Sequence, residues 1–289
     1  MNPRALVVPF TKMNGAGNDF IVLDNRFFRF SDAELSGLAR RYCPRRVGVG
    51  ADGLLALNVP EADGAHYRMR YFNADGSLGT MCGNGARCLA RYARQAGLAA
   101  EPLVFDTDGG RYTAEVPAEV PAEGDVRLRV PPPRAFGEVA LLDAEVEGPT
   151  YGIWTGTEHA VRFVEDVRVA PVATEGPAIR RDAALAPAGA NVNFVQIETS
   201  GLDGLARVRV RTFEKGVEAE TLACGTGALA SALAARLSGR VQAERVEVVM
   251  PGGALRVGFR LGEDGAAESV RDLTLEGPAE VVYLGTLAV

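Results

Sequence analysis

Residues 206–239 read ARVRVRTFEKGVEAETLACGTGALASALAARLSG, and an earlier stretch, residues 67–97, reads YRMRYFNADGSLGTMCGNGARCLARYARQAG. Each stretch opens with alternating apolar and polar residues that end at Phe213 or Phe72, a pattern that predicts a half-buried strand. A polar loop, a Cys-Gly-x-Gly-Ala segment and a helical stretch follow in both copies. The chain therefore contains an internal repeat, which organises the prediction of its fold.

The helical part of each copy stops at a glycine, Gly97 or Gly239. A glycine at this point fits a left-handed cap, because it has no Cβ to oppose a positive φ. In the second copy, Leu229, Leu233 and Leu237 recur at every fourth position, which predicts one apolar stripe along the helix.

Two further pairs of segments extend the repeat. VFDTDGGRYTAEV at 104–116 and VVMPGGALRVGF at 248–259 each predict a strand, a double-glycine turn and a second strand. GAGNDFIVLD at 15–24 and GANVNFVQIE at 189–198 form a weaker match. Three matches in the same order predict two domains of similar fold, each rich in strands around a helix. The proline-rich segment 116–134 is the natural linker between them.

The composition describes a globular protein and excludes several classes of partner. The 289 residues are 47% hydrophobic, which is enough for large cores, and the net charge of -6 comes from interspersed signs. Phosphate backbones require a basic stripe, so we expect no nucleic-acid partner. The start, MNPRALVVPFTKMNG, lacks a signal-peptide core, and no apolar run approaches the roughly 20 residues of a membrane span. We therefore expect no membrane partner and a cytoplasmic location.

Cys82 and Cys224 each lie where a loop becomes a helix, followed by Gly-Asn-Gly or Gly-Thr-Gly. At a helix N-terminus, the unpaired amides and the positive dipole lower a thiol pKa from its reference of about 8.5. The same amides bind carboxylates, and glycine lets the backbone approach a ligand closely. Each helix start therefore predicts a reactive sulfur next to an anion-binding stretch of backbone.

Two such helix starts, one in each domain, are expected to converge on a single ligand between the domains. Epimerisation removes a proton from one face of a stereocentre and returns a proton to the other face, so it needs two groups on opposite sides. One cysteine would be the thiolate base and the other the thiol acid, with the roles exchanged in the reverse reaction.

Other interpretations of the cysteines are a buried apolar role, a disulfide framework and a metal site. Cysteine is often a small buried hydrophobe, and we keep that interpretation for Cys43 and Cys88. Four cysteines without dense spacing predict reduced thiols, and zinc is disfavoured because no CxxC pair and only two histidines exist. Pyridoxal phosphate enzymes need a Schiff-base lysine, and the only lysines, Lys12 and Lys215, lack a phosphate-binding context. We expect no cofactor.

Six segments resemble the successive signatures of the diaminopimelate epimerase family, in its order and over essentially the whole chain. They are TKMNGAGNDFIVLDN, VGVGADGLL, YFNADGSLGTMCGNGARC, NVNFV, FEKGVEAETLACGTGA and MPGGAL. The resemblance implies an α/β (α+β) fold of two pseudo-symmetric domains, each a strand-rich sheet or barrel wrapped around a central helix. It implies a first domain of residues 1–125 with 277–289 and a second domain of residues 126–276.

The resemblance also implies an activity, the interconversion of LL- and meso-2,6-diaminopimelate without metal or pyridoxal phosphate, in lysine and cell-wall precursor biosynthesis. Cys82 and Cys224 match the two catalytic residues. Glu214 matches a family acid near the substrate ammonium, and His159 matches the supporting histidine. The remaining matches are expected substrate contacts, and the four that directly follow the cysteines would offer backbone amides to the reacting carboxylate. These contacts are Asn18, Gly53, Asn73, Gly83, Asn84, Thr157, Asn191, Lys215, Gly225 and Thr226.

Several of these residues also fit a purely structural role. Asn73 lies in NADG, which suits an ordinary turn. Asn191 could open a strand, and a lone His159 would more often be a hydrogen-bonded structural residue. Asn73 and Glu214 are equivalent in the repeat, since each follows the phenylalanine that ends a strand, so we expect both to face the ligand.

The chain departs from the family pattern in a few places. Thr157 and Glu158 stand where many members have Asn-Pro before the histidine. Lys215 stands where arginine is usual, so it keeps the charge but loses the planar fork that grips a carboxylate in two places. The loop after Gly216 is one residue longer than the commonest form, which predicts a bulge. Gly53 replaces a glutamine of some members and can contribute only backbone.

Three rival functions remain open on the sequence. An epimerase or racemase for another amino acid, such as proline or hydroxyproline, would also use paired cysteines. A phenazine-biosynthesis-type isomerase shares the architecture but lacks the cysteine pair, and a non-catalytic amino-acid-binding protein would be expected to lose one cysteine. The expected substrate is a small amino acid, and a homodimer is the expected assembly.

Overall fold

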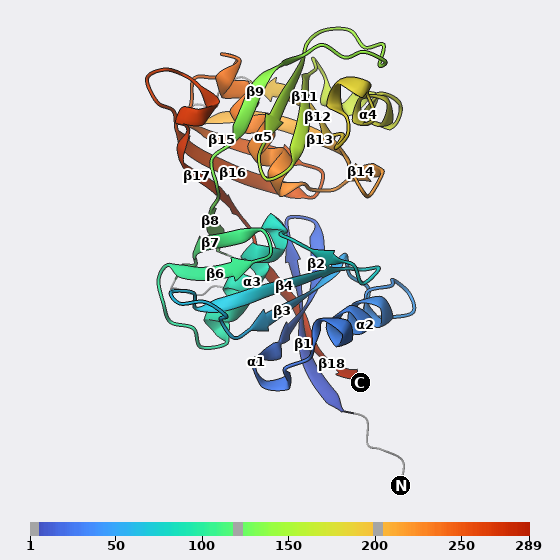
Figure 1. Cartoon of the computed structure of the whole chain (residues 1–289), viewed down its shortest axis with the longest axis vertical. Helices are drawn as coiled ribbons and strands as arrows, with labels where there is room; N and C mark the ends of the chain where they lie inside the picture. Colours follow the sequence, from blue (N-terminus) through green and yellow to red (C-terminus); the bar gives the residue numbers. More distant parts are fainter. Residues whose placement is uncertain (1–5, 118–123, 199–204) are drawn as a thin grey trace. The chain divides into compact units, whose positions relative to one another are not determined.

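The structure is a computed structural model of the 289-residue chain, and it describes residues 6–117, 124–198 and 205–289. Two compact units form, Met1–Leu128 with Gly277–Val289, and Arg129–Glu276. Strands outnumber helices in both units (Figure 1). The predicted strand-rich α+β class is confirmed.

The first unit is built on a sheet in which hydrogen bonds connect β18–β1–β2–β3–β4–β6–β7, with β5 added to the end of β4. The pairs β2–β3 and β4–β6 are parallel, and parallel neighbours require a crossover, which α2 and α3 provide. The elements are β1 (Val7–Gly15), β2 (Asn18–Asp24), α1 (Asn25–Phe28), α2 (Asp32–Tyr42), β3 (Gly53–Asn58), β4 (Tyr67–Asn73), β5 (Leu78–Gly79), α3 (Gly83–Gln95), β6 (Leu103–Thr107), β7 (Gly110–Glu115) and β18 (Glu280–Ala288).

The second unit repeats this plan. Hydrogen bonds connect β9–β10–β11–β12–β13–β15–β16–β17, with β14 added to the end of β13. The pairs β11–β12 and β13–β15 are parallel, and α4 and α5 form their crossovers. The elements are β9 (Arg134–Val139), β10 (Thr150–Trp154), β11 (Glu158–Phe163), α4 (Val172–Arg180), β12 (Asn191–Glu198), β13 (Ala206–Glu214), β14 (Ala219–Thr221), α5 (Gly225–Leu237), β15 (Arg245–Met250), β16 (Gly253–Arg260) and β17 (Arg271–Gly277), with short 3-10 turns at Val167–Val169, Ala183–Leu185 and Ala267–Ser269.

The shared order of elements tests the predicted repeat. The strand, loop and helix of residues 67–97 and 206–239 are β4–β5–α3 and β13–β14–α5, so that match is confirmed. The double-glycine segments form the hairpins β6–β7 and β15–β16, as predicted. The weaker match of 15–24 with 189–198 is wrong, because it aligns β2 with β12, whereas the pairing makes β3 the counterpart of β12. The two sequences are similar because β2 and β12 are both apolar strands that follow a glycine.

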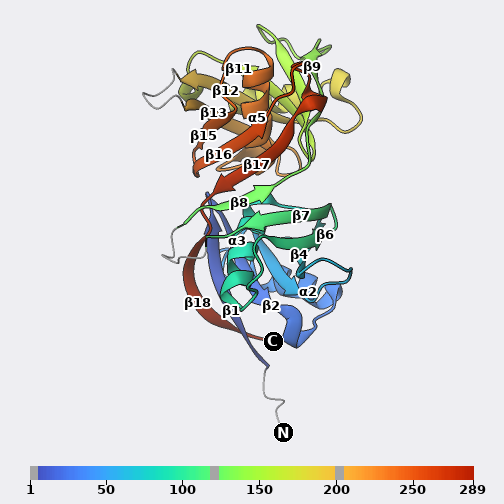
Figure 2. The same ribbon diagram turned by 90° about the vertical axis from the view of Figure 1, so that its left-hand side faces the viewer.

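The central helix of each unit is α3 or α5, and strands enclose both helices (Figures 1 and 2). In α5, every residue from Gly227 to Ala235 is buried, and the helix contacts β10, β11, β12, β13, β15 and β16. The buried surface of α5 is therefore wider than the single apolar stripe that was predicted. The alanines on the other faces are buried as well, because small side chains let strands approach the helix from all sides. Gly97 and Gly239 have φ of 93° and 75°, which confirms the left-handed caps.

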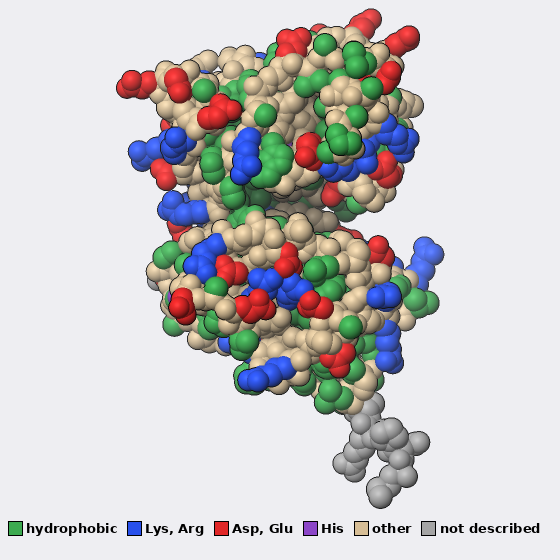
Figure 3. Space-filling view, viewed as in Figure 1, with side chains coloured by type: hydrophobic (Ala, Val, Ile, Leu, Met, Phe, Trp, Pro, Cys, Tyr) green, Lys and Arg blue, Asp and Glu red, His purple; other side chains and the backbone are tan. Residues whose placement is uncertain are grey.

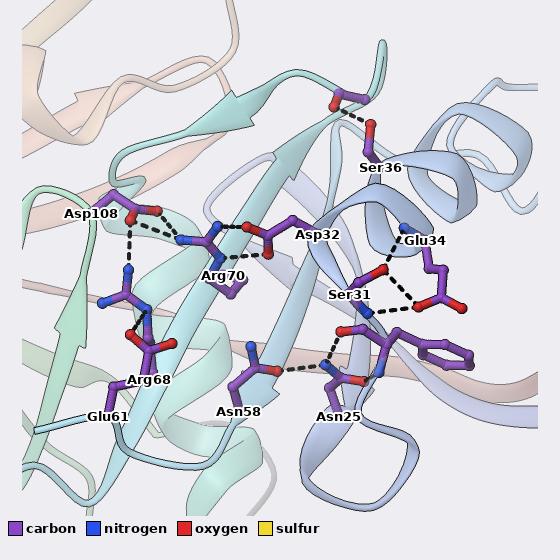
Figure 4. Close-up of polar contacts among 12 residues, drawn as sticks. Asn25, Ser31, Asp32, Glu34, Ser36, Asn58, Glu61, Arg68, Arg70 and Asp108 are labelled. Atoms are coloured by element: carbon purple, nitrogen blue, oxygen red, sulfur yellow. Dashed lines mark hydrogen bonds and ion pairs between the residues drawn. The ribbon is translucent and has the colours of Figure 1, made fainter.

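Ion pairs fasten α2 to the first sheet. Figure 4 shows the buried Arg70 of β4 between Asp32 at the start of α2 and Asp108 in the β6–β7 turn. Arg70 Nη1 lies 2.6 Å from Asp108 Oδ2. Ser31 and Glu34 form a capping box that begins α2. One strand residue therefore holds both a crossover helix and a hairpin in place.

The predicted linker at 116–134 is partly structured. Its residues 118–123, like residues 1–5 of the N-terminal segment, lie outside the described residues. The described part contains strand β8 (Val126–Arg129), in which Val126 and Leu128 are buried, and the chain passes between the units at Leu128. This part of the segment is a packed strand, because alternate apolar side chains give it a buried face. The assignment of the two units as epimerase domains with boundaries at residues 125 and 277 stays a prediction.

Surface charges of both signs are interspersed on the face of each unit that Figure 3 draws. The outward face of the β1–β18 pair is apolar instead, since Val7, Val282 and Leu284 are exposed there. Within the described ranges, no helix is both long and apolar enough to cross a bilayer.

Candidate functional site

Cys82 is the N-cap of α3 and Cys224 is the N-cap of α5, as predicted. The Gly85 N–H donates to Cys82 Sγ at 3.5 Å, and the Gly227 N–H donates to Cys224 Sγ at 3.3 Å. Both caps have extended backbone, so the side chain turns back over the first turn of its helix. Each sulfur therefore accepts a hydrogen bond at the positive end of a helix dipole, which favours the thiolate.

The residues that follow each cysteine open the helices. Gly83 and Asn84 are the first two residues of α3, and Gly225 and Thr226 are the first two of α5. Backbone N–H groups in a first turn have no acceptor within their own helix, so they can bind an anion. The Thr226 hydroxyl also lies 3.5 Å from Cys224 Sγ.

A polar network connects the start of α3 to the start of β2. The Asn84 side-chain amide donates to Asn18 Oδ1 at 2.6 Å, and the Asn18 amide donates to Asp52 Oδ2 at 3.0 Å. Arg45 joins Asp52 to Asp19, with Nη2 2.9 Å from Asp52 Oδ1. Two predicted substrate contacts, Asn18 and Asn84, are therefore brought together and held in fixed orientation.

Arg87 lies in α3, five residues after Cys82, and its side chain is fully buried. Its Nη2 donates to Asn84 Oδ1 at 2.8 Å and its Nε donates to the Pro278 carbonyl at 3.4 Å, while Nη1 has no hydrogen-bond partner among the described residues. Burial lowers the pKa of Arg87, and the charge interactions with Cys88 and then with Cys82 oppose that shift, so the guanidinium charge in turn favours a thiolate at Cys82. The counterpart in α5 is Leu229, which carries no charge.

Gly53 and Asn73 are neighbours across the β3–β4 pair. A Cβ on Gly53 would lie 2.6 Å from the Phe72 carbonyl oxygen and 2.7 Å from the Tyr71 ring, so this strand approach requires glycine. The Asn73 amide donates to Ser77 Oγ at 2.9 Å and its Oδ1 accepts from the Tyr71 hydroxyl at 2.7 Å. Asn73 thus binds within its own turn in this structure, and its role toward a substrate stays a prediction.

In the second unit, His159 of β11 and Asn191 of β12 are paired across parallel strands and buried. Asn191 Nδ2 lies 3.5 Å from His159 Nε2, and Asn191 Oδ1 accepts from the Lys215 N–H at 2.8 Å. Burial lowers the pKa of His159 to about 3, and the positive charge of Lys215 lowers it as well, against the opposing effect of Glu158. The imidazole is therefore neutral at physiological pH.

Lys215 forms an ion pair with Glu158, with Nζ 2.7 Å from Oε2. The Thr157 hydroxyl donates to the same carboxylate oxygen at 3.1 Å. The two family departures, Lys215 and the Thr157–Glu158 dipeptide, are thus in contact with each other. Lys215 lowers the pKa of Glu158 through this hydrogen bond.

Glu214 is the last residue of β13, as Asn73 is the last residue of β4. The chain then turns through a hairpin in which Glu214 pairs with Ala219 and the Glu218 N–H donates to the Glu214 carbonyl. β13 and β14 pair in regular register, and the bulge expected from the longer loop stays a prediction. In the turn between the two strands, Gly216 and Glu218 have positive φ.

The remaining thiols are structural. Cys43 and Cys88 are buried, as predicted, and burial raises the pKa of both to about 12. Across the described residues, no group of three His, Cys, Asp or Glu side chains is arranged to hold a metal ion.

A family model described as diaminopimelate epimerase matches residues 10–128 and 151–268. The chain belongs to the diaminopimelate epimerase family. As a member of that family it is an isomerase. The diaminopimelate epimerase of Chlorobaculum tepidum is 42% identical over 284 residues, which cover 95% of this chain and 99% of that protein. The corresponding protein of Methanocella arvoryzae is 38% identical over 294 residues, covering 98% and 97%.

Solved structures of lower identity share the fold of this family member. A phenazine biosynthesis protein of the PhzF family from Bacillus anthracis matches with a TM-score of 0.75 at 17% identity, covering 98% of this chain and 100% of that chain. A hydroxyproline epimerase from Agrobacterium vitis matches with a TM-score of 0.68 at 17% identity, covering 99% and 92%. These likenesses show the fold alone.

Three residues beside the predicted site of this epimerase were not predicted. Arg87 donates to Asn84 in the helix that begins at Cys82, and Thr155 Oγ1 donates to the Thr226 carbonyl at 2.9 Å. Asn193 is buried beside His159. Polar residues inside an apolar strand or helix were the available signal, as in NVNFV and GNGARC.

Proposed function

We propose that this protein interconverts LL-2,6-diaminopimelate and meso-2,6-diaminopimelate with two cysteines and no cofactor. One observation carries the proposal: the central helix of each unit begins at a cysteine whose sulfur accepts an amide hydrogen bond of the first turn. The two helix starts occupy equivalent places in the repeat, and each combines a sulfur with amides that suit a carboxylate. We propose that the two units are the two epimerase domains and that each supplies one of the two catalytic cysteines.

In the proposed reaction, the thiolate of one cysteine removes the α-hydrogen as a proton. The C–H bond breaks and an S–H bond forms, while the electron pair delocalises into the α-carboxylate. The first-turn amides, from Gly83 and Asn84 and from Gly225 and Thr226, stabilise this charge as it develops. The thiol of the other cysteine then delivers its proton to the opposite face of the carbon, and it is left as the thiolate.

The residues around the helix starts have supporting roles in this proposal. Glu214 acts near the substrate ammonium, and His159 supports the reacting groups from its buried position. Lys215 binds the distal carboxylate as a point charge, in an orientation that its ion pair with Glu158 maintains. The other proposed substrate contacts are Asn18, Gly53, Asn73, Thr157 and Asn191.

The product would serve lysine and cell-wall precursor biosynthesis. We propose a cytoplasmic location, since an acid–base pair of cysteines needs thiols that stay reduced, as they do in cytosol. We also propose a homodimer through the exposed apolar face of Val7, Val282 and Leu284 on β1 and β18. Sedimentation velocity of the purified protein and of Leu284→Glu would test this assembly, since a monomeric parent protein would exclude it.

The activity is tested by solvent exchange. The reduced protein, with no added cofactor, should exchange the α-hydrogen of diaminopimelate for deuterium, which proton magnetic resonance detects. Cys82→Ala and Cys224→Ala should each abolish epimerisation, whereas Cys43→Ala, a matched change of a buried structural thiol, should retain it. No exchange by a folded, reduced sample would exclude the epimerase reaction, and near-normal turnover in either active-site variant would exclude the two-base scheme.

A further inference from the structure

Four buried polar side chains lie together on the strands that contact α5. Register pairs His159 of β11 with Asn191 of β12, and it pairs Asn193 of β12 with Thr212 of β13. His159 is 1% exposed, and Asn193 and Thr212 are 0% exposed. Buried polar groups are costly unless they are hydrogen-bonded, so their donors and acceptors can be assigned.

The orientation of the Asn193 amide follows from two neighbours. Its Nδ2 lies 3.3 Å from the Ala160 carbonyl oxygen, which can only accept, so this atom is the amide nitrogen. Its Oδ1 accepts from the Thr212 hydroxyl at 2.9 Å. The same Nδ2 lies 3.1 Å from His159 Nδ1. An amide nitrogen only donates, so His159 Nδ1 must be the acceptor and carry no proton.

The proton of the neutral imidazole therefore lies on Nε2. The ring is neutral because burial, with Lys215, lowers the His159 pKa to about 3. Glu158 is the charged group that opposes this effect, and it is already paired with Lys215. The electrostatic surroundings and the hydrogen bond from Asn193 thus select the same protonation state.

Asn191 presents a second donor next to His159 Nε2. Its Oδ1 accepts from the Lys215 backbone N–H, so its Nδ2 is the atom that faces the imidazole at 3.5 Å. Two donors cannot satisfy each other. An oxygen anion that accepted from both N–H groups would satisfy both donors.

We propose that Asn193 is a positioning residue that holds His159 as the Nε2–H tautomer, so that His159 and Asn191 together donate to a carboxylate of the amino-acid substrate. The inference rests on the proposed function and deepens it. It makes His159 a hydrogen-bond donor in the reaction and not a base. Asn193 also lies close to the Cys224 helix start, since a Cβ added at Gly227 would be 2.5 Å from Asn193 Oδ1.

The tautomer can be measured without any substrate. The chain has two histidines, His66 and His159, so the two-bond proton–nitrogen spectrum of histidine-labelled protein contains two rings, and His66→Gln assigns them. At neutral pH we expect His159 to show a protonated, pyrrole-type Nε2 and an unprotonated, pyridine-type Nδ1. A protonated Nδ1 or an imidazolium would overturn the inference even if the protein were a fully active epimerase.

A variant tests the role of Asn193 itself. In Asn193→Asp a carboxylate replaces the amide donor and accepts from Nδ1–H, so the His159 spectrum should change to a protonated Nδ1. Asn58→Asp is the matched control in the first unit, where the Asn58 side-chain oxygen only accepts from Asn25 (Figure 4), and it should leave the His159 signals unchanged. An unchanged His159 tautomer in folded Asn193→Asp would overturn the positioning role. If that variant fails to fold, the spectrum of the parent protein still decides the tautomer.

A titration separates the donor role from the tautomer. Diaminopimelate added to the parent protein should shift the His159 Nε2 resonance and leave that of His66 in place. Turnover of diaminopimelate without any shift at Nε2 would overturn the donor role and leave the proposed activity intact. The reverse result, a shift without turnover, would keep the donor pair and contradict the proposed reaction.

Discussion

Replacing Gly227 by alanine should destabilise the second unit. Gly227 lies in the first turn of α5, where a Cβ would be 2.5 Å from Asn193 Oδ1 and 3.2 Å from Cys224 Sγ. Ordinary contacts of a Cβ begin at 3.4 Å, so Asn193 would have to retreat by about 0.9 Å. It cannot do so freely, because its amide binds the Ala160 carbonyl and the Thr212 hydroxyl.

The size of this destabilisation combines two contributions that destabilise the variant and one that stabilises it. Overpacking a close contact costs about 1–3 kcal/mol. A buried hydrogen bond that loses its partner costs a further ~1–3 kcal/mol. Alanine is favoured over glycine within a helix by about 1 kcal/mol, which offsets part of the loss. We therefore expect the free energy of unfolding of the second unit to fall by about 3 kcal/mol.

Urea unfolding followed by the fluorescence of Trp154 measures this change, because Trp154 is the only tryptophan and lies in the second unit. Gly137→Ala is the matched control: Gly137 belongs to the same unit, and a Cβ there would meet nothing within 4 Å. Its unfolding midpoint should stay close to that of the parent protein. The reasoning is refuted if Gly227→Ala unfolds at the same urea concentration as the parent, or at a higher one.

Two other measurements address titration in the two units. Iodoacetamide at neutral pH should modify Cys82 well before Cys43 or Cys88, because burial raises the pKa of the Cys43 and Cys88 thiols to about 12. Peptide mass spectrometry would show the order of labelling, and equal labelling of the three thiols in the native protein would contradict this prediction. Burial raises the pKa of Asp182, but donation from four backbone N–H groups outweighs it and holds the pKa at about 2. The ionised Asp182 carboxylate stabilises the fold above its unfolded pKa near 4, and this stabilisation should disappear as the pH falls to about 2. Asp182→Asn lacks the carboxylate, so its stability, followed by Trp154 fluorescence, should not show this loss between about pH 4 and about pH 2. Identical acid transitions in both proteins would show that Asp182 does not contribute.

The helix starts were predictable because their signals are local. A strand that ends in phenylalanine, a polar loop and Cys-Gly-x-Gly appear twice, and the structure has β4–α3 and β13–α5 at these places. The glycine caps at Gly97 and Gly239 depend on the backbone of one or two residues, so they too were predictable. The family signatures are equally contiguous in the sequence.

Strand pairing was less accessible, because it depends on partners far apart in the chain. The match of β2 with β12 was wrong, since alternating apolar residues describe any half-buried strand and do not specify its neighbours. The burial of α5 on all sides was also missed. Its leucine spacing indicates one face, and only the strands that pack on the others show that its alanines are core residues.

The sequence by itself determined the two cysteine helix starts, the repeat of strand, loop and helix, and the family. Only the tertiary structure decided that Asn193 and His159 accompany Cys224 beside the first turn of α5. The physical reason is that a hydrogen bond depends on which side chains the strand register brings within about 3 Å. Asn193 and His159 are 34 positions apart in the chain, and the parallel pairing of β11 with β12 makes them neighbours.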